Sequence, residues 1–235
     1  MSERAKLLLV DDERQILRTL QTTLGTQGYE IRTAANGLDG LILFREWEPD
    51  LVITDLSMPE MSGVELCREI RSTSPTPIIV LSVRDQEGAK VAALDAGADD
   101  YVTKPFNIQE LKARVRAQLR RKDATTIGTQ KSVHSGDFAI DVPQHRVLVR
   151  GQEVRLTPKQ FDLLLYMAQQ PGIVLSHREL LNAVWGPNAV GQPEYLRVAI
   201  GQLRKRLGEA GDVYIQTEPW IGYRFVPESP EGATP

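Results

Sequence analysis

The residues best suited to chemistry in this sequence are polar side chains that each follow a short apolar segment. They are three carboxylates, a hydroxyl and an amine: Asp11, Asp12, Asp55, Ser82 and Lys104. Adjacent carboxylates repel unless a cation neutralises them, and Mg²⁺ suits an open site with one or two carboxylates, water and a phosphate. We therefore predict that Asp55 is a nucleophile in phosphoryl transfer, with Mg²⁺ and Lys104 stabilising charge on the transferring oxygens. Ser82 is expected to donate a hydrogen bond to a phosphoryl oxygen.

These residues can meet only if a common sheet positions them. Residues 1–122 alternate predicted strands at 6–10, 30–34, 50–54, 77–81 and 101–103 with helical patterns near 13–26, 38–47, 63–72, 86–96 and 107–121. Consecutive apolar residues within the third and fourth strands are typical of a parallel sheet that is covered on both faces. The pattern predicts an α/β doubly wound five-stranded parallel sheet of the flavodoxin-like type. Its ligand site should lie beyond the carboxyl ends of the strands.

Each polar residue also has a simpler structural explanation. Asp11 alone would be read as the N-cap of the following helix. Lys104 alone would be read as a solvated surface lysine. The combination at equivalent strand ends favours the functional interpretation.

After residue 122 the character of the chain changes. Residues 123–131 are small, polar and aperiodic, which predicts a flexible linker. Between 132 and 227 the sequence predicts a hairpin around 150–152, helices that begin near Thr157, Ser176 and Pro193, and a terminal hairpin formed by 214–217 and 222–225. This order predicts a winged helix-turn-helix domain. Residues 228–235 are expected to be disordered.

Composition narrows the class of protein. A length of 235 residues suits two domains, and fractions of 41% hydrophobic and 25% charged residues are ordinary for a soluble protein. No apolar run approaches the roughly 20 residues of a membrane span, and the single Cys67 cannot form an internal disulfide. We therefore expect a cytoplasmic protein with no membrane partner. A net charge of −3 is not typical of a nucleic-acid-binding protein. Any positive charge that contacts DNA must therefore be concentrated in one part of the chain.

The first half resembles the receiver domains of response regulators. The matching pieces are Asp11-Asp12, the segment 55–59 with Gly63, Ser82, and Lys104-Pro105-Phe106. The resemblance implies that a sensor histidine kinase phosphorylates Asp55. It also implies that Asp12, Asp55 and the main-chain carbonyl of Ser57 hold Mg²⁺, with Asp11 acting through water. Tyr101 would swing inward when Ser82 engages the phosphoryl group; otherwise it is a core tyrosine at the start of a strand.

The segment 98–106 resembles the OmpR/PhoB family in particular. This resemblance implies a homodimer that forms on phosphorylation through the fourth helix, fifth strand and fifth helix. Four charge pairs across that dimer are expected: Lys90 with Glu110, Asp100 with Arg114, Asp99 with Arg121, and Asp95 with Arg116. Without the resemblance these would be solvated helix faces, because exposed ion pairs usually contribute less than ~1 kcal/mol.

The second half resembles the effector domains of the same family. The matching segments are 156–158 with Phe161, 180–185, 203–207 and 222–225. They imply transcription regulation through double-stranded DNA, with RNA polymerase as a further partner. Residues expected at DNA lie on the helix from residue 193 to about 207 and on the terminal hairpin: Arg197, Gln202, Arg204, Lys205, Thr217 and Trp220.

Two details of this half go beyond the family pattern. Pro219 and Trp220 stand where many relatives carry an Arg-Gly pair, so an arginine in the minor groove is not implied. Trp220 is expected to pack against the DNA sugar or backbone, or else to cover the hairpin. The segment 185–190 with Tyr195, Arg197 and Gly201 is similar to the KdpE branch, regulators of potassium-uptake operons.

Two other functions remain open from the sequence. The acidic site could belong to a phosphatase or hydrolase, although no second nucleophile or general acid is apparent. The chain could also bind DNA independently of phosphorylation, which the complete acidic set disfavours. We expect no enzyme activity beyond the chain's own phosphoryl transfer and dephosphorylation.

Overall fold

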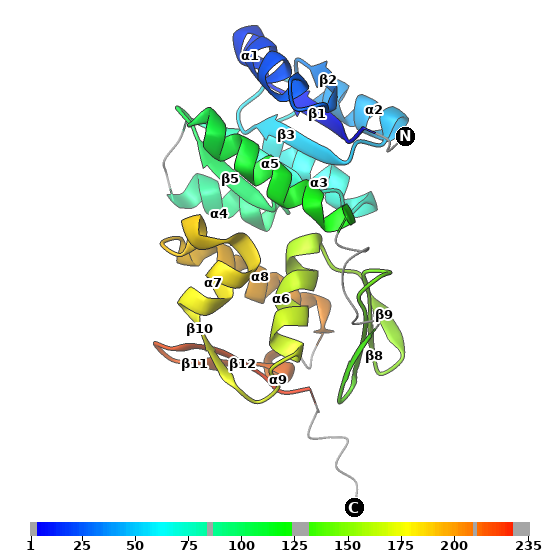
Figure 1. Ribbon diagram of the computed structural model, residues 1–235, viewed down its shortest axis with the longest axis vertical. Coiled ribbons are helices and arrows are strands. Elements are labelled where there is room, and N and C mark those ends of the chain that lie inside the picture. The colour runs from blue at the N-terminus through cyan, green and yellow to red at the C-terminus, as the bar shows by residue number, and fades with distance from the viewer. Residues whose placement is uncertain (1–3, 84–86, 124–131, 209–210, 228–235) are drawn as a thin grey trace, which may run out of the picture. The chain divides into compact units, whose positions relative to one another are not determined.

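The computed structural model describes residues 4–83, 87–123, 132–208 and 211–227 (Figure 1). The chain divides into two compact units, Met1–Ala124 and Thr125–Pro235, and each is considered by itself. The expected linker and tail lie outside the described residues apart from Asp123, the last residue of a helix. Within the described ranges, no helix combines the length and apolar character needed to cross a membrane.

The first unit is built on a five-stranded parallel sheet. Its strands are β1 (Lys6–Val10), β2 (Glu30–Ala34), β3 (Leu51–Asp55), β4 (Ile78–Ser82) and β5 (Asp100–Thr103), in the order β2-β1-β3-β4-β5. The predicted sheet is confirmed. β3 and β4 each begin and end one residue later than expected, so that Asp55 and Ser82 are the last residues of their strands.

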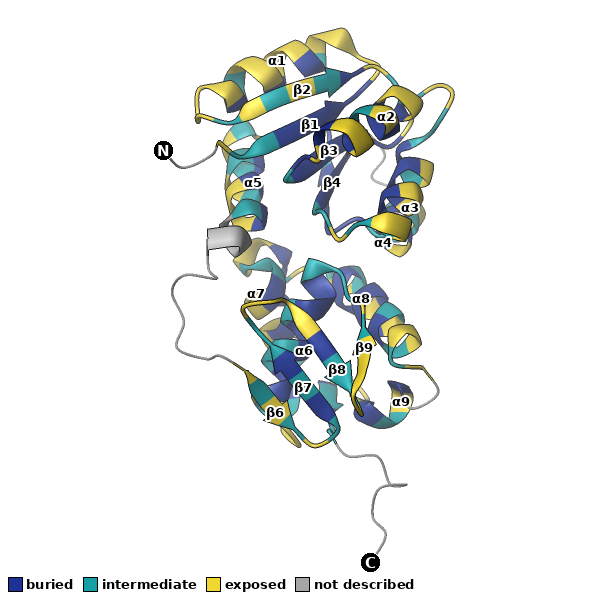
Figure 2. Cartoon of the chain, turned by 90° about the vertical axis from the view of Figure 1, so that its right-hand side faces the viewer, coloured by how far each residue is buried: buried dark blue, intermediate teal, exposed yellow. Residues whose placement is uncertain are grey.

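Helices cover both faces of this sheet. They are α1 (Arg14–Gly25), α2 (Gly37–Trp47), α3 (Gly63–Thr73), α4 (Glu87–Asp95) and α5 (Ile108–Asp123). Leu7 and Leu9 of β1 share a core with leucines of α1 and with Leu111 of α5. Because side chains alternate along a strand, Val10 faces the other way, where a Cβ on Gly40 of α2 would lie only 3.0 Å from it. Both faces of the sheet are therefore buried (Figure 2).

The second unit contains three main helices between two antiparallel sheets. The first sheet joins β6 (Val133–Ser135), β7 (Phe138–Asp141), β8 (Arg146–Val149) and β9 (Gln152–Val154) in sequence order. The helices are α6 (Pro158–Ala168), α7 (His177–Trp185) and α8 (Pro193–Arg206), and the second sheet has the order β10 (Val174–Ser176), β12 (Gly222–Phe225), β11 (Ile215–Glu218). The predicted winged helix is confirmed. The short α9 (Gly211–Tyr214) and β10 were not predicted, because three or four residues carry no periodicity.

The helix starts follow local hydrogen bonding. The side chain of Thr157 accepts from the N–H of Gln160, and Gln160 Oε1 accepts from the N–H of Thr157, so the two residues form a capping box. Ser176 accepts from the N–H of Glu179 at the start of α7. These contacts satisfy N–H groups that the first turn of a helix leaves without partners.

An aromatic cluster connects the two sheets of the second unit. The ring of Phe138 lies edge-on to those of Tyr214 and Phe225, with centroids 4.8 and 4.9 Å away. The hydroxyl of Tyr214 donates to Asp137 at 2.5 Å. Burial, together with this hydrogen bond, raises the pKa of Tyr214 to about 12. The hydroxyl therefore remains a donor at neutral pH and holds the cluster in place.

Candidate functional site

The ends of β1, β3 and β5 bring two carboxylates and an amine together. Lys104 Nζ lies 2.6 Å from Oδ1 of Asp55 and 2.8 Å from Oδ2 of Asp11. All three residues are buried, with exposed fractions of 8%, 5% and 2% in that order. Buried charges are tolerated when they are paired and hydrogen-bonded, and this arrangement meets that condition. The expected convergence of Asp11, Asp55 and Lys104 at one sheet edge is therefore present.

The second oxygen of each carboxylate is held by a main-chain N–H. Asp55 Oδ2 accepts from the N–H of Ser57 at 2.7 Å, and Asp11 Oδ1 accepts from the N–H of Glu13 at 2.9 Å. Each carboxylate thus has a fixed orientation, with one oxygen on Lys104 and the other on the backbone. An oxygen that attacks phosphorus gains from such positioning.

Gly63 allows the close packing that supports this loop. A Cβ at Gly63 would lie 2.0 Å from the carbonyl oxygen of Asp55, so no larger residue fits without movement. The N–H of Gly63 also donates to the carbonyl of Leu56 at 3.0 Å. The start of α3 is consequently fixed against the residue that follows Asp55.

Burial and pairing shift the ionisation of two members of the site. Burial raises the pKa of Asp11 above its ordinary value, and the hydrogen bond from Lys104 only partly opposes this. Burial also acts to lower the pKa of Lys104, but the hydrogen bonds to Asp11 and Asp55 outweigh it, and the net pKa is raised. Lys104 is therefore a stable cation beside the carboxylate of Asp55.

The other predicted members of the site lie around this centre. Ser82 is buried at the end of β4, and its carbonyl accepts from the N–H of Lys104 at 2.6 Å. The bond between Lys104 and Pro105 is cis. Asp12 is exposed beside Asp11, and Tyr101 is buried on β5.

The donor set of this site suits a hard divalent cation. The carboxylates of Asp11, Asp12 and Asp55 outnumber the ammonium of Lys104, which leaves an excess of negative charge on oxygen ligands. Among the described residues, no group of three or more His, Cys, Asp and Glu side chains is arranged around a common metal position. Any metal here would need the main chain, water or phosphate as further ligands.

Charged residues of the expected dimer face make contacts inside the chain. Arg114 donates to both carboxylate oxygens of Asp100, at 2.7 and 2.9 Å, and to Glu110 at 2.7 Å. Lys90 is half-buried, whereas Asp95 and Arg116 are exposed. The side chain of Arg121 lies outside the described residues. The four pairings between subunits remain predictions.

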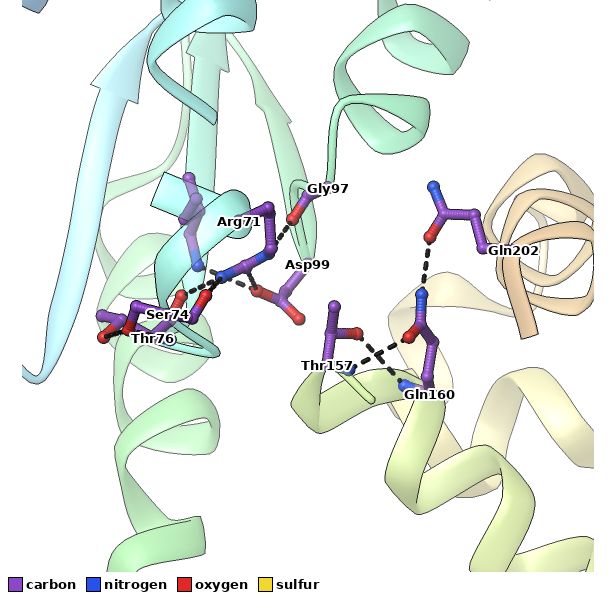
Figure 3. Close-up of polar contacts among 9 residues, drawn as sticks. Arg71, Ser74, Thr76, Gly97, Asp99, Thr157, Gln160 and Gln202 are labelled. Atoms are coloured by element: carbon purple, nitrogen blue, oxygen red, sulfur yellow. Dashed lines mark hydrogen bonds and ion pairs between the residues drawn. The ribbon is translucent and has the colours of Figure 1, made fainter. Parts of the chain in front are cut away.

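Asp99 belongs to a buried cluster that sequence reasoning missed. Arg71 at the end of α3 forms an ion pair with Asp99 and donates to the carbonyl of Gly97 at 2.7 Å (Figure 3). Asp99 also accepts from the N–H of Ile78 at 2.9 Å. This carboxylate therefore connects α3 with the first residue of β4, a structural role that its position in the sequence did not signal.

On α8, Leu196, Ile200 and Leu203 are buried and form the core face of the helix, whereas Leu207, just beyond its end, is half-buried. Arg197 and Lys205 are exposed, which leaves their charges accessible from solvent. Gln202 is half-buried, and its Oε1 accepts from Nε2 of Gln160 at 2.8 Å.

Arg204 and Thr217, both expected at DNA, contact each other. Arg204 Nε donates to the carbonyl of Ile215 at 3.0 Å, and a terminal nitrogen donates to Oγ1 of Thr217 at 2.9 Å. Asp212 lies 2.9 Å from the same Nε. Contact of Arg204 with DNA remains a prediction. Within the chain, Arg204 has a structural role, because it connects α8 with β11.

Trp220 projects from the turn between β11 and β12. Its exposed fraction is 99%, and its neighbour Ile221 is 56% exposed. The backbone of Trp220 has a φ of 66°, in the left-handed region that non-glycine residues rarely adopt. Of the two expected roles, covering the hairpin is wrong, because a side chain this exposed does not shield the hairpin strands β11 and β12.

Comparison with known families and proteins assigns both units. Residues 7–116 match the family described as response regulator receiver domain, and residues 151–225 match that described as transcriptional regulatory protein, C terminal. Over 223 residues the chain is 46% identical to the KDP operon transcriptional regulatory protein KdpE of Escherichia coli, covering 94% of this chain and 98% of that protein. It is 42% identical over 221 residues to the transcriptional regulatory protein KdpE of Mycobacterium tuberculosis, covering 93% and 98%.

Solved structures give the same result. The response regulator DrrB of Thermotoga maritima, described as an OmpR/PhoB homolog, has a TM-score of 0.51 and 32% identity and covers 95% of this chain and 100% of its own. A mutant of RitR has a TM-score of 0.75 and 25% identity, with 96% and 100% covered.

Proposed function

Because this chain belongs to the OmpR/PhoB family of two-component response regulators, we propose that phosphorylation of Asp55 by a sensor histidine kinase controls DNA binding by the second unit. The observation that carries this proposal is the contact of Lys104 with both Asp55 and Asp11 at the strand ends. It supports the proposal because it brings the carboxylate of Asp55 together with a fixed cation and a second carboxylate.

The proposed reaction is the attack of an Asp55 carboxylate oxygen on the phosphorus of a phosphorylated histidine of the kinase. A P–O bond to Asp55 forms, the P–N bond to the histidine breaks, and the histidine side chain leaves. Lys104 stabilises negative charge on the transferring oxygens, and the N–H of Ser57 holds the attacking carboxylate in one orientation. Asp12, Asp55 and the carbonyl of Ser57, with Asp11 acting through water, would hold Mg²⁺, which supplies further positive charge beside the phosphoryl group.

Phosphorylation of Asp55 then alters the dimer face. Ser82 donates to a phosphoryl oxygen, Tyr101 reorients, and two receiver units pair through α4, β5 and α5. A receiver dimer brings two DNA-binding units together, so that binding of the first raises the effective concentration of the second. Activation therefore requires no conformational change within the DNA-binding unit itself.

The second unit reads double-stranded DNA and regulates transcription in contact with RNA polymerase. Its α8 enters the major groove, where Arg197, Gln202 and Lys205 are placed to reach base edges or phosphates. Since two similar proteins are named KdpE, we propose an operon for potassium uptake as the target. The expected location is the cytoplasm.

The test is phosphorylation of the full-length chain by a small phosphodonor with Mg²⁺. Mass spectrometry should detect one added phosphoryl group on the wild-type chain and none on Asp55→Asn. Equal labelling of Asp55→Asn would refute the assignment. Steady multiple turnover of a phosphomonoester would instead support a phosphatase.

A further inference from the structure

Gly201 is an exposed glycine in the interior of α8, the helix proposed to read DNA. It lies well inside the bounds of the helix, Pro193 and Arg206, and its backbone is helical, so no turn or left-handed conformation requires glycine here. A glycine inside a helix lowers the equilibrium constant of folding by about two- to fivefold relative to alanine. This cost to stability asks for a compensating role.

Packing within the second unit does not supply that role. Apart from its two chain neighbours and the backbone of its own helix, no described atom lies within 4 Å of the position that a Cβ on Gly201 would take. Gly40 of α2 shows the opposite case, because a Cβ there would lie only 3.0 Å from Val10. The described part of the chain therefore has room for a side chain at position 201 and gains nothing from its absence.

Gly201 stands between two exposed cations on the outer face of α8. Arg197 precedes it by four residues and Lys205 follows it by four, and residues four apart in a helix share one face. At 3.6 residues per turn, Gly201 stands about 140° around the helix from Leu196 and about 160° from Leu203. Both leucines are buried in the core. The outer face of α8 thus lacks a side chain at its middle and carries positive charge one turn away on each side.

This face suits a close approach to the edges of DNA bases. Glycine allows a backbone to lie nearer to a ligand than any other residue does. A helix with its side chains is about 10–12 Å across and the major groove is about 12 Å wide, so one carbon atom on the outer face changes how deeply the helix can enter. The flanking cations would meet phosphates or guanine on either side of the closest point.

We propose that Gly201 is the point of closest contact between α8 and the base edges of double-stranded DNA, and that its missing side chain lets Arg197 reach a base. The inference rests on the proposed function, since it requires α8 to enter the major groove. It assigns a role in sequence recognition to a residue that has neither charge nor a side-chain hydrogen bond to offer.

Gly201→Ala tests this through two effects of opposite sign. Alanine favours the helix, so the second unit should melt at a temperature about 5 °C higher than in wild type. The added Cβ should meet the base edges and hold α8 away from them, so the affinity for a specific DNA site should fall although the fold is more stable. A residue that served folding alone would not give this combination.

The measurement compares two duplexes of equal length, with every chain full-length and in the same phosphorylation state. One duplex is a site that the wild type selects from a random DNA library, and the other is a scrambled version of it. Gly201→Ala should bind the selected duplex about tenfold more weakly, as loss of one base contact predicts. Its affinity for the scrambled duplex should stay within about twofold of wild type, because non-specific binding depends on phosphate charge. Calorimetry gives the melting temperature, and the transition of the second unit is the one that the selected duplex raises.

Two further single variants separate close approach from other effects. Gly25→Ala is the matched control, because Gly25 is exposed at the end of α1 in the first unit and also has open space where its Cβ would lie. It should bind both duplexes as wild type does. Gly201→Leu keeps a strong helix former but carries a larger side chain, so it should bind the selected duplex more weakly than Gly201→Ala does.

A double variant tests the link to Arg197. Arg197→Ala already lacks the proposed base contact, so holding α8 away from the bases has less to disrupt. Adding Gly201→Ala to it should therefore weaken binding of the selected duplex by less than about threefold, against about tenfold in the wild-type background.

Four results would overturn the inference while leaving the proposed function intact. They are unchanged affinity of Gly201→Ala for the selected duplex, an equal loss on the scrambled duplex, a lowered melting temperature of Gly201→Ala, and a full tenfold loss in the Arg197→Ala background. The second would indicate contact with the phosphate backbone, and the third a structural role of the glycine. If the wild type selects no sequence from the library, the proposed function itself fails, and the inference fails with it.

Discussion

Arg204 on α8 donates to the main-chain carbonyl oxygen of Ile215 on β11, from Nε at 3.0 Å and from a terminal nitrogen at 2.5 Å. Ile215 is fully buried, so Arg204 supplies these hydrogen bonds to a carbonyl that is shielded from solvent. The helix proposed to read DNA is therefore held to the terminal hairpin by one of its own side chains. Arg204 fixes the orientation of α8 whether or not it also contacts phosphate.

We expect Arg204→Ala to lower the free energy of unfolding of the second unit by about 2 kcal/mol, because a buried carbonyl loses its charged donor. Chemical denaturation of the full-length chain, followed by tryptophan fluorescence, measures this change. Lys205→Ala is the matched control, since this exposed neighbour should change stability by less than about 0.5 kcal/mol. Equal stability of the two variants would show that the bridge contributes nothing.

The fold was largely predictable because its long elements carry clear periodicity. Runs such as residues 78–81 are typical of a strand with helices on both faces, and the observed β4 differs from its prediction by one residue. The convergence of Asp11, Asp55 and Lys104 followed from parallel topology alone. The four residues of α9 and the three of β10 were missed, because their formation depends on packing and not on a local pattern.

Side-chain partners were less predictable than side-chain positions. The resemblance to the OmpR/PhoB family predicts Asp99 at a dimer face, whereas within the chain Arg71 on α3, 28 residues earlier, forms an ion pair with it. Nothing in the spacing of Arg71 indicates this contact, because it depends on how α3 lies against the start of β4. Likewise, Gln160 could be predicted as a capping residue, whereas its bond to Gln202 requires the packing of α6 on α8.

The stability of the first unit should depend on the ionisation of Asp11. Since its folded pKa is raised above the ordinary value of 3.8, the folded chain binds this proton more tightly than the unfolded chain does. Its contribution to stability is therefore lost as the pH rises from 3.8 through the folded pKa. We expect Asp11→Asn, which cannot ionise, to be more stable than wild type at neutral pH in metal-free buffer.

Urea denaturation at several pH values tests this expectation. The stability advantage of Asp11→Asn should shrink as the pH falls towards 3.8. Asp12→Asn serves as the control, because Asp12 is exposed and should show a smaller advantage. An advantage for Asp11→Asn that is independent of pH would mean that the charge of this carboxylate is not its cause.

Dimerisation tests the expected contact of Lys90 with Glu110 across two subunits. Lys90→Glu should weaken the dimer that a phosphate analogue induces, and the added change Glu110→Lys should restore part of it. Because Glu110 also bonds Arg114 within its own chain, recovery should be incomplete. Sedimentation that shows no loss in the single variant, or no recovery in the double, would exclude this pair.

Substitution of Trp220 should change the affinity for DNA without changing which sequence is preferred. An indole that is 99% exposed contributes little to folding, so Trp220→Ala should leave the free energy of unfolding within about 0.5 kcal/mol of wild type. Its apolar ring can pack on DNA sugars but offers no charge, and it should raise affinity for all sequences alike. Arg197→Ala is the contrasting variant, since an arginine that pairs with guanine contributes about 1–3 kcal/mol of discrimination. Binding-site selection with both variants tests these roles. A changed base preference in Trp220→Ala, together with an unchanged preference in Arg197→Ala, would contradict them.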